Sequence, residues 1–340
     1  MKLFTFIPVT IFSVLLSTVH SADSVDATND FYDNEKTHHL KVNPVTVSGE
    51  IDHPGKVDFT LLPLRTVIVK EAILDKGKDA FVGAYRYDGY SLYDILNTRT
   101  LHKKNANAFK PIIDAFIVVE NDAGDEVVIS WGELFYPVNP HQILIATQVM
   151  RIVPSRTREL WPLPEKARLI CAHDLLTERN IANPVTITVR SSEKQFKVRK
   201  GLKPLYADTF SIYRGDSLVE AVAQKPGFVQ EFSYDNVFYG RGKGIHGIST
   251  FTGIALKEIL LPHFPIASSR LSSGYFVVAA ADGYRGVFTY SEIANRNDQS
   301  ETLLVTTRKG EHEGRFKLYP AGDFFSDRAI KAVTGIYYFE

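Results

Sequence analysis

The chain is nearly devoid of cysteine. Only one of its 340 residues, Cys171, carries a thiol. A single cysteine excludes an intramolecular disulfide framework and every zinc site that needs paired cysteine ligands. Its neighbours Ile170 and Ala172 are apolar, which predicts a buried structural thiol rather than a metal ligand.

An excess of charge of either sign is also missing. Lys and Arg together number 39, as do Asp and Glu, so the formal net charge at pH 7 is zero. These totals argue against a nucleic-acid-binding protein and against an acidic disordered tail. With 44% hydrophobic and 12% aromatic residues, the chain can bury a large core, and its length predicts two domains.

The longest apolar run is too short for a membrane-spanning helix. Residues 3–16 follow Lys2 and precede small residues suited to cleavage after Ser21 or Ala22. A membrane span needs about 20 apolar residues, so residues 1–22 are predicted to be a signal peptide and not a stable membrane anchor. There is no Asn-x-Ser/Thr sequon, and we expect a periplasmic or secreted bacterial protein.

Residues 23–42 are predicted to form a flexible leader. They are polar, with little periodicity, and include the pair His38 and His39. Neighbouring side chains on a strand point apart and no third ligand is evident, so a solvated loop is favoured over a metal site.

The remaining chain contains an internal repeat. Residues 116–134 (FIVVENDAGDEVVISWGEL) align without a gap on residues 275–293 (YFVVAAADGYRGVFTYSEI), and the same offset aligns residues 143–148 with 302–307. Further equivalent blocks are residues 89–96 with 253–260 and residues 168–174 with 317–323, followed by Arg179 with Arg328. We therefore predict two copies of one domain, residues 43–184 and 185–340.

Each copy has the pattern of a short helix followed by a hairpin. Leu92, Ile95 and Leu96 have helical spacing after a glycine, and Leu256, Ile259 and Leu260 repeat it. A Val-rich strand then turns at Gly124 or Gly283 and returns, as in a β-hairpin whose strands are buried. Residues 44–49 and 57–61 are predicted to be further strands, and the fold class is therefore α+β and strand-rich.

Several segments resemble a known family. They are residues 47–55 (VSGEIDHPG), the Gly-x-x-Leu-x-x-Ile-Leu segment of both copies, residues 282–292 (DGYRGVFTYSE), and residues 315–323 continuing to 328–336. Their order is similar to that in the molybdopterin-binding domain of sulfite-oxidase-like oxidoreductases. The resemblance implies two divergent copies of the sulfite-oxidase-like fold.

The same resemblance implies molybdopterin as a cofactor, with molybdenum held by one protein cysteine ahead of the helix. The equivalent stretches are residues 67–73 and 232–239, and neither contains cysteine. Because thiolate is the soft ligand that this metal requires, the chain departs from the family at the metal. No metal ligand and no catalytic residue are predicted.

The loop at residues 240–247 (GRGKGIHG) is the candidate ligand site. Its glycines free backbone N–H groups to converge, and Arg241, Lys243 and His246 supply positive charge, which suits an anion such as a pterin phosphate. The alternative is an exposed surface loop, since the Lys-Ser/Thr ending of a phosphate-binding loop is missing.

Other motifs have structural interpretations. Ser217 in the Arg-Gly-Asp-Ser-Leu segment lacks the downstream Asp-x-x-His of a hydrolase, and Asp216 or Ser217 is instead predicted to cap a helix carrying Leu218, Ala221 and Val222. Glu133 and Glu292 follow strands at the start of short helices, where a carboxylate complements the helix dipole. Trp161 is expected to fold onto the first domain.

Three functions are compatible with these observations. The first is an exported protein without molybdenum catalysis that binds a small anionic ligand or a protein partner. The second is a periplasmic molybdopterin-dependent oxidoreductase with an atypical ligand set. The third is a structural or surface-interaction module with two faces supplied by duplication.

Overall fold

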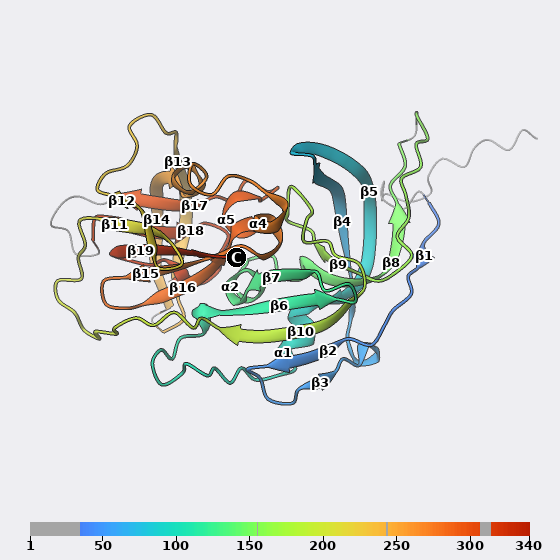
Figure 1. The fold of residues 1–340 in the computed structure, drawn as a ribbon, viewed down its shortest axis with the longest axis horizontal. Helices are drawn as coiled ribbons and strands as arrows, with labels where there is room; N and C mark the ends of the chain where they lie inside the picture. Colours follow the sequence, from blue (N-terminus) through green and yellow to red (C-terminus); the bar gives the residue numbers. More distant parts are fainter. Residues whose placement is uncertain (1–34, 155, 243, 307–313) are drawn as a thin grey trace, which may run out of the picture.

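The computed structural model describes residues 35–154, 156–242, 244–306 and 314–340. The predicted signal peptide, residues 1–22, lies outside these residues, as does Lys243. Strands make up 46% of the structure and helices 12%, and the four small sheets are arranged as the four blades of a β-propeller (Figure 1). The α+β, sulfite-oxidase-like fold class predicted from the sequence is therefore wrong.

The first half of the chain forms two sheets. One has the order β1-β8-β5-β4, with β9 also paired to β8. Its long hairpin β4–β5 curves upward in Figure 1, and Ala72 and Leu74 near its end pack against the apolar core of the second half. The strands are β1 (His38–His39), β4 (Leu64–Asp75), β5 (Lys78–Ser91), β8 (Ile143–Arg151) and β9 (Arg168–Cys171).

The other sheet of the first half has the order β3-β2-β10-β6-β7. Strand β10 runs parallel to β2 and antiparallel to β6. Gly49 ends β2 with φ of +94°, and a Cβ there would lie 2.1 Å from the carbonyl oxygen of Val189, so this close approach requires glycine. The strands are β2 (Thr46–Gly49), β3 (Gly55–Lys56), β6 (Ala115–Asn121), β7 (Glu126–Ser130) and β10 (Pro184–Ser191).

The second half also forms two sheets. Their orders are β12-β11-β19-β15-β16 and β13-β14-β17-β18. The strands of the first are β11 (Phe210–Arg214), β12 (Ser217–Val222), β15 (Tyr275–Ala280), β16 (Arg285–Thr289) and β19 (Val333–Phe339). Those of the second are β13 (Glu231–Gly240), β14 (Gly244–Ala255), β17 (Thr302–Thr306) and β18 (Phe316–Pro320).

The two halves share one topology. The parallel pair β11–β19 corresponds to β2–β10, and the antiparallel hairpin β15–β16 corresponds to β6–β7. Likewise β13-β14-β17-β18 corresponds to β4-β5-β8-β9. Strand β10 completes the sheet of the first half and runs to Ser191, so the first half extends seven residues beyond the predicted boundary at residue 184.

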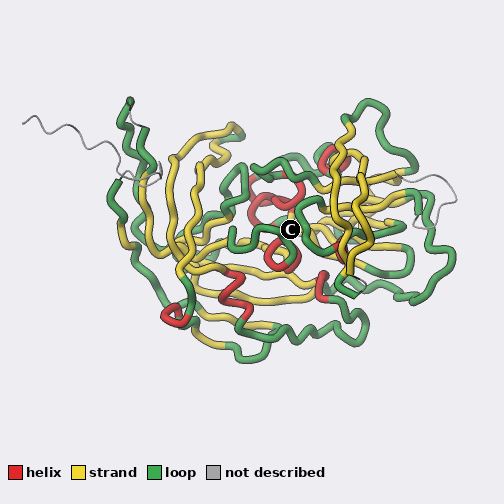
Figure 2. Tube along the Cα trace, turned by 180° about the vertical axis from the view of Figure 1, so that it is seen from behind, coloured by secondary structure: helices red, strands yellow, loops and turns green. Residues whose placement is uncertain are grey.

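The helices are short, and several gather near the middle of the molecule (Figure 2). Helix α1 buries Leu92, Ile95 and Leu96, and α3 buries Ile259 and Leu260, which confirms the predicted apolar stripes. The helices are α1 (Leu92–Asn97), α2 (Trp131–Phe135), α3 (Lys257–Leu260), α4 (Ser268–Ser273) and α5 (Tyr290–Ala294), with 3-10 turns η1 (Phe59–Leu61), η2 (Ile112–Asp114) and η3 (Ser326–Arg328).

Each half has its own apolar core, and a smaller cluster joins them. The joining cluster contains Val118 and Val128 from the first half and Val277 and Val287 from the second, all buried. The two predicted hairpins are confirmed, and their strands are buried between other elements as expected. Trp161 packs on the first half and donates its indole N–H to the Ile152 carbonyl at 3.0 Å.

Three local predictions are wrong. Residues 59–61 form the 3-10 turn η1, because Asp58 caps it by accepting from the Thr60 N–H at 3.0 Å. The helix expected after Ser217 is strand β12, since Gly215 (φ +57°) turns the chain back to pair with β11. His38 and His39 form strand β1 beside β8 rather than a solvated loop.

Candidate functional site

The two halves meet at two equivalent helix starts. Before α2, the Ser130 hydroxyl accepts from the Glu133 N–H (2.8 Å) while the Glu133 carboxylate accepts from the Ser130 N–H (2.8 Å). Thr289 and Glu292 form the same capping box before α5, at 3.1 and 3.2 Å. The predicted role of both glutamates at helix starts is thus confirmed.

Each glutamate is also paired with a buried arginine. Arg179 binds Asp174 with two hydrogen bonds of 2.8 and 2.7 Å and binds Glu133 at 2.8 Å. In the second half, Arg328 binds Asp323 at 2.8 and 2.7 Å and forms an ion pair with Glu292. Both guanidinium groups are almost completely buried, so their charges must be compensated within the protein.

The capping hydroxyls connect the two clusters across the boundary between the halves. Ser130 donates to Glu292 at 2.9 Å, and Thr289 donates to Glu133 at 3.3 Å. We call the eight residues the interface network: Ser130, Glu133, Asp174, Arg179, Thr289, Glu292, Asp323 and Arg328. Because equivalent residues bridge in both directions, the network fixes the halves relative to each other by hydrogen bonds as well as by apolar contact.

Burial and charge act in opposite directions on the acids of this network. Burial raises the pKa of Glu133, but the charge of Arg179, assisted by His173, outweighs it and lowers the pKa to about 2. For Asp323, burial dominates over the opposing effect of Arg328 and raises the pKa to about 6. Glu133 therefore stays ionised at a lower pH than Asp323 does.

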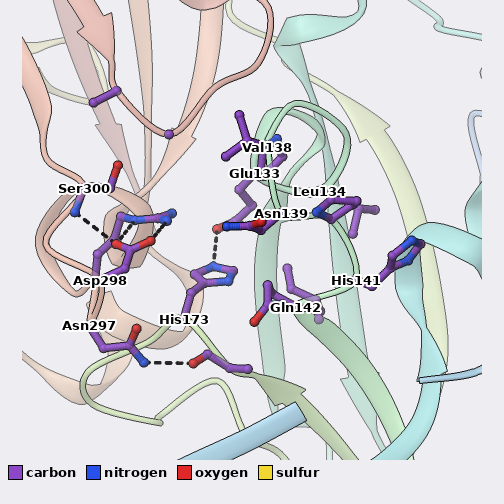
Figure 3. Close-up of a pocket in the computed structure, with 17 residues that line it drawn as sticks. Glu133, Leu134, Val138, Asn139, His141, Gln142, His173, Asn297, Asp298 and Ser300 are labelled. Atoms are coloured by element: carbon purple, nitrogen blue, oxygen red, sulfur yellow. Dashed lines mark hydrogen bonds and ion pairs between the residues drawn. The ribbon is translucent and has the colours of Figure 1, made fainter. Parts of the chain in front are cut away.

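A cavity of about 490 Å³ adjoins the network on the boundary between the halves. The first half contributes residues 133–134, 137–143 and 172–173, and the second half contributes 296–298, 300 and 321–322. By the sequence alignment these are mostly equivalent loops, so the cavity lies where the repeat brings the two copies face to face. We call it the cleft, and its polar side chains include Asn139, His141, Gln142, His173, Arg296 and Asp298 (Figure 3).

The two halves contribute different polar side chains to the cleft. From the first half, the His173 imidazole Nε2 lies 3.6 Å from the Glu133 carboxylate (Figure 3). Its alignment partner in the second half is Gly322. From the second half, Arg296 donates its Nε–H to Asp298 at 2.9 Å, which holds the guanidinium along the cleft wall. The cleft thus combines an imidazole, a guanidinium and a carboxylate.

Asn297 joins the loops on opposite sides of the boundary. Its side-chain amide donates to the carbonyl oxygens of Ala172 (2.8 Å) and Asp174 (3.1 Å) in the first half. This contact, drawn in Figure 3, fixes the His173 loop against the Arg296 loop. The polar groups of the cleft are therefore held in place by hydrogen bonds beneath them.

One set of residues near the cleft has the composition of a hydrolytic triad but lacks its geometry. His141 lies 3.2 Å from the Ser91 hydroxyl and 3.5 Å from the Asp94 carboxylate, and both contacts use the same ring nitrogen, Nδ1. A triad needs the two ring nitrogens to face different partners. Ser91 is also fully buried and caps α1, so it cannot attack a substrate.

The predicted anion site lies elsewhere. Arg241 is exposed at the turn between β13 and β14 and donates to the Tyr136 hydroxyl of the first half at 3.1 Å. His246 is exposed with its ring centroid 5.6 Å from that of Phe238. Neither residue lines the cleft, and Lys243 lies outside the described residues.

Sequence reasoning missed the cleft residues His173, Arg296 and Asp298. The aligned blocks carry the same Glu, Asp and Arg in both copies, which was a signal for the interface network but not for these three cleft residues, none of which is repeated. Charged residues repeated within otherwise apolar blocks could have indicated paired, buried ions at a boundary between copies.

The residues present do not fit a molybdenum centre held by thiolate. Cys171 is fully buried in the apolar core of the first half, and burial raises the pKa of its thiol. A thiol in this position faces neither the cleft nor solvent and is disfavoured as a thiolate. The predicted structural role of Cys171 is confirmed.

In the part of the chain that the structure describes, no group of three or more His, Cys, Asp or Glu side chains could hold a metal ion. Among the same residues, no helix has the length and apolar character needed to cross a membrane. Comparison of the sequence with protein-family models and with curated proteins found no match.

Proposed function

We propose that the protein binds a small polar ligand in the cleft between its two halves and acts as a non-catalytic binding protein. The observation that carries this proposal is the cavity of about 490 Å³ on the boundary, with fixed polar groups from both halves. Ligand sites in proteins commonly have volumes of about 300–1,000 Å³ and lie at boundaries between domains.

The cleft selects for hydrogen-bonding ability rather than for charge of one sign. The charge of Arg296 is matched by Asp298, and that of Glu133 by Arg179. Asn139 and Gln142 add amide groups that both donate and accept. A ligand with donors and acceptors, such as a hydroxy acid, an amino acid or a sugar, matches this lining.

The lining does not support a catalytic role for the cleft. The only serine–histidine pair at its edge, Ser91 and His141, has the geometry of a helix cap and not of a nucleophile. His173 faces Glu133 and Arg179, which are already hydrogen-bonded to each other within the interface network. Binding without turnover therefore accounts for the arrangement better than acid–base or nucleophilic catalysis.

The proposal also includes the location of the protein outside the cytoplasm. Residues 1–22 have the pattern of an export signal, which supports a periplasmic or secreted binding protein.

A thermal-shift panel tests the function. Hydroxy acids, amino acids and sugars are added to the mature protein, to Asn139→Trp, which places a large ring in the cleft, and to the exposed Asn107→Trp as the control. A ligand of the native state raises the melting temperature by mass action. We expect at least one compound to stabilise the wild type and Asn107→Trp but not Asn139→Trp.

Two results would count against the proposal. One is a panel in which nothing stabilises the wild type. The other is stabilisation that persists in Asn139→Trp, because the compound would then bind outside the cleft. If a partner protein stabilised the wild type and none of the small molecules did, the structural or surface-interaction role would be favoured instead.

A further inference from the structure

A second cavity lies on the boundary between the halves and shares no residue with the cleft. It has a volume of about 560 Å³ and is bordered by the end of β10 in the first half and by β15 and β19 in the second. We call it the seam groove. Its lining includes the side chains of Lys104, Phe116, Arg190, Glu193, Tyr275 and Phe339.

One wall of the seam groove is a row of stacked aromatic rings. Phe116 stacks on Tyr275 with centroids 4.9 Å apart, and Tyr275 stacks on Phe339 at 5.3 Å. Phe116 and Tyr275 are equivalent in the repeat, so the row crosses the boundary between the copies. Burial raises the pKa of the Tyr275 phenol, which keeps it a neutral hydroxyl donor at physiological pH. Because the rings stack on one another, they offer their edges to the groove, and ring edges suit the face of a planar group.

The lining of the groove also carries three cations and two carboxylates, and one of the cations, Lys194, is paired with Asp216. Lys104 and Arg190 line the groove and form no ion pair with a described residue. Of the acids, Glu50 is occupied by the N–H and hydroxyl of Ser191 (3.0 and 2.6 Å) and by the N–H of Lys104 (2.8 Å). Glu193 is the remaining carboxylate of the lining.

A buried charge cluster is linked to the lining of the groove. Lys103 and Arg285 share a single carboxylate, Asp114, and all three are buried. Asn105 links the cluster to the groove wall by donating to Asp114 at 2.9 Å and to the Ser192 carbonyl at 3.0 Å. Two cations around one anion leave a net positive charge in a medium of low dielectric, where it acts at longer range than in water.

The Arg285 guanidinium in this cluster is not fully satisfied. Its Nε–H donates to Asp114 at 3.1 Å, whereas Nη1 and Nη2 are buried without a hydrogen-bond partner in the described structure. The guanidinium lies over the Phe109 ring at 4.3 Å. Buried donors of this kind keep their attraction for negative charge, since no acceptor offsets it.

From the aromatic wall, the cations Lys104 and Arg190 and the buried cluster of two cations on one carboxylate, we propose that the seam groove binds an anion with a planar apolar body, of the class of aromatic carboxylates. The rings of Phe116 and Tyr275 would take the planar body, and Arg190 and Lys104 the carboxylate. The seam groove is separate from the cleft, and this proposal does not depend on whether the cleft binds a ligand.

Three probes of similar size separate the contributions. 2-Naphthoate carries both a planar body and a charge, 2-naphthamide keeps the body without the charge, and a saturated decalin carboxylate keeps the charge without the aromatic face. Titration calorimetry on the mature protein should give one site for 2-naphthoate. Both comparison probes should bind at least about fivefold more weakly.

Variants locate the site. Arg190→Gln should weaken 2-naphthoate about tenfold and leave 2-naphthamide nearly unchanged, while Tyr275→Leu should weaken both. Lys70→Gln, an exposed lysine on β4, is the matched charge control, and Asn139→Trp tests independence from the cleft. Neither of these should change the affinity, and circular dichroism spectra check that every variant folds.

The proposal is overturned if 2-naphthoate shows no saturable binding, or if it binds no better than 2-naphthamide. It is also overturned if Arg190→Gln binds like Lys70→Gln. Loss of 2-naphthoate binding in Asn139→Trp alone would assign the probe to the cleft and leave the seam groove without a ligand.

Discussion

Replacing Arg328 by methionine probes the interface network. Its guanidinium binds Asp323 through two hydrogen bonds and also pairs with Glu292, and its side chain is only 2% exposed. Methionine keeps most of the length and apolar stem but removes the charge. Two buried carboxylates then lose their counter-ion, a change that costs about 3–5 kcal/mol of folding free energy in buried pairs.

That loss is large against a total stability of about 5–15 kcal/mol for a typical protein. Urea or guanidinium denaturation followed by circular dichroism measures it directly. The control is Arg65→Met, which removes a guanidinium from a partly exposed pair with Asp94 at 2.9 Å. Partly exposed pairs contribute about 0–1 kcal/mol, so the control should unfold close to the wild type.

The pH dependence gives the prediction a second readout. Without Arg328, the pKa of Asp323 in the folded state, which burial already raises to about 6, rises further above its unfolded value. A carboxyl with a raised folded pKa favours folding below its unfolded pKa, and this contribution is lost as the pH rises through the folded pKa. The deficit of Arg328→Met should therefore be largest at pH 7–8 and shrink toward pH 5.

Equal, small losses for Arg328→Met and Arg65→Met would refute the reasoning, because they would mean that the network is not desolvated. A deficit of constant size from pH 5 to pH 8 would also refute it. In that case the loss would come from packing alone and not from uncompensated carboxylates.

Three further outcomes follow from the same structure. Because the pKa of Glu133 is lowered in the folded state, its carboxylate stabilises the fold above pH 4.5, and this contribution is lost as the pH falls toward 2. Glu133→Gln should therefore lower the midpoint of urea denaturation at pH 7 and make that midpoint less dependent on acid. An unchanged acid dependence would contradict this. A Cβ on Gly132 would lie 2.3 Å from the Arg328 guanidinium, so Gly132→Ala should lower the free energy of unfolding by about 1–3 kcal/mol. Gly227 has no atom within 4 Å of such a Cβ, and Gly227→Ala should change the free energy of unfolding little. Equal losses for the two variants would argue against close packing at Gly132. Cys171 should resist a thiol reagent such as dithionitrobenzoate in the native protein and react stoichiometrically in concentrated guanidinium chloride, whereas rapid native labelling would show that it is accessible.

Local elements could be predicted from the sequence where the pattern itself determines the structure. The spacing of Leu92, Ile95 and Leu96 specifies a helix turn wherever it occurs, and the Val-rich blocks around Gly124 and Gly283 specify hairpins. The assembly of sheets was not predictable in this way. The parallel pairing of Thr46 with Thr186, for example, joins strands far apart in the chain, and no local pattern encodes it.

The same limitation explains the errors at single elements. Leu218, Ala221 and Val222 have helical spacing, but pairing with β11 makes the segment a strand. Arg179 and Arg328 are buried although charged residues are usually exposed, and only their repetition in both copies pointed to buried ion pairs. The resemblance to molybdopterin-binding domains rested on local patterns of this kind, which do not determine how sheets are arranged.

A crystal structure of the protein soaked with the compound that stabilises it most tests the central claim most directly. The account predicts electron density for the compound in the cleft, within hydrogen-bonding distance of Arg296 or His173 and with groups of both halves around it. Density at any other position, with the cleft holding only solvent, would contradict it.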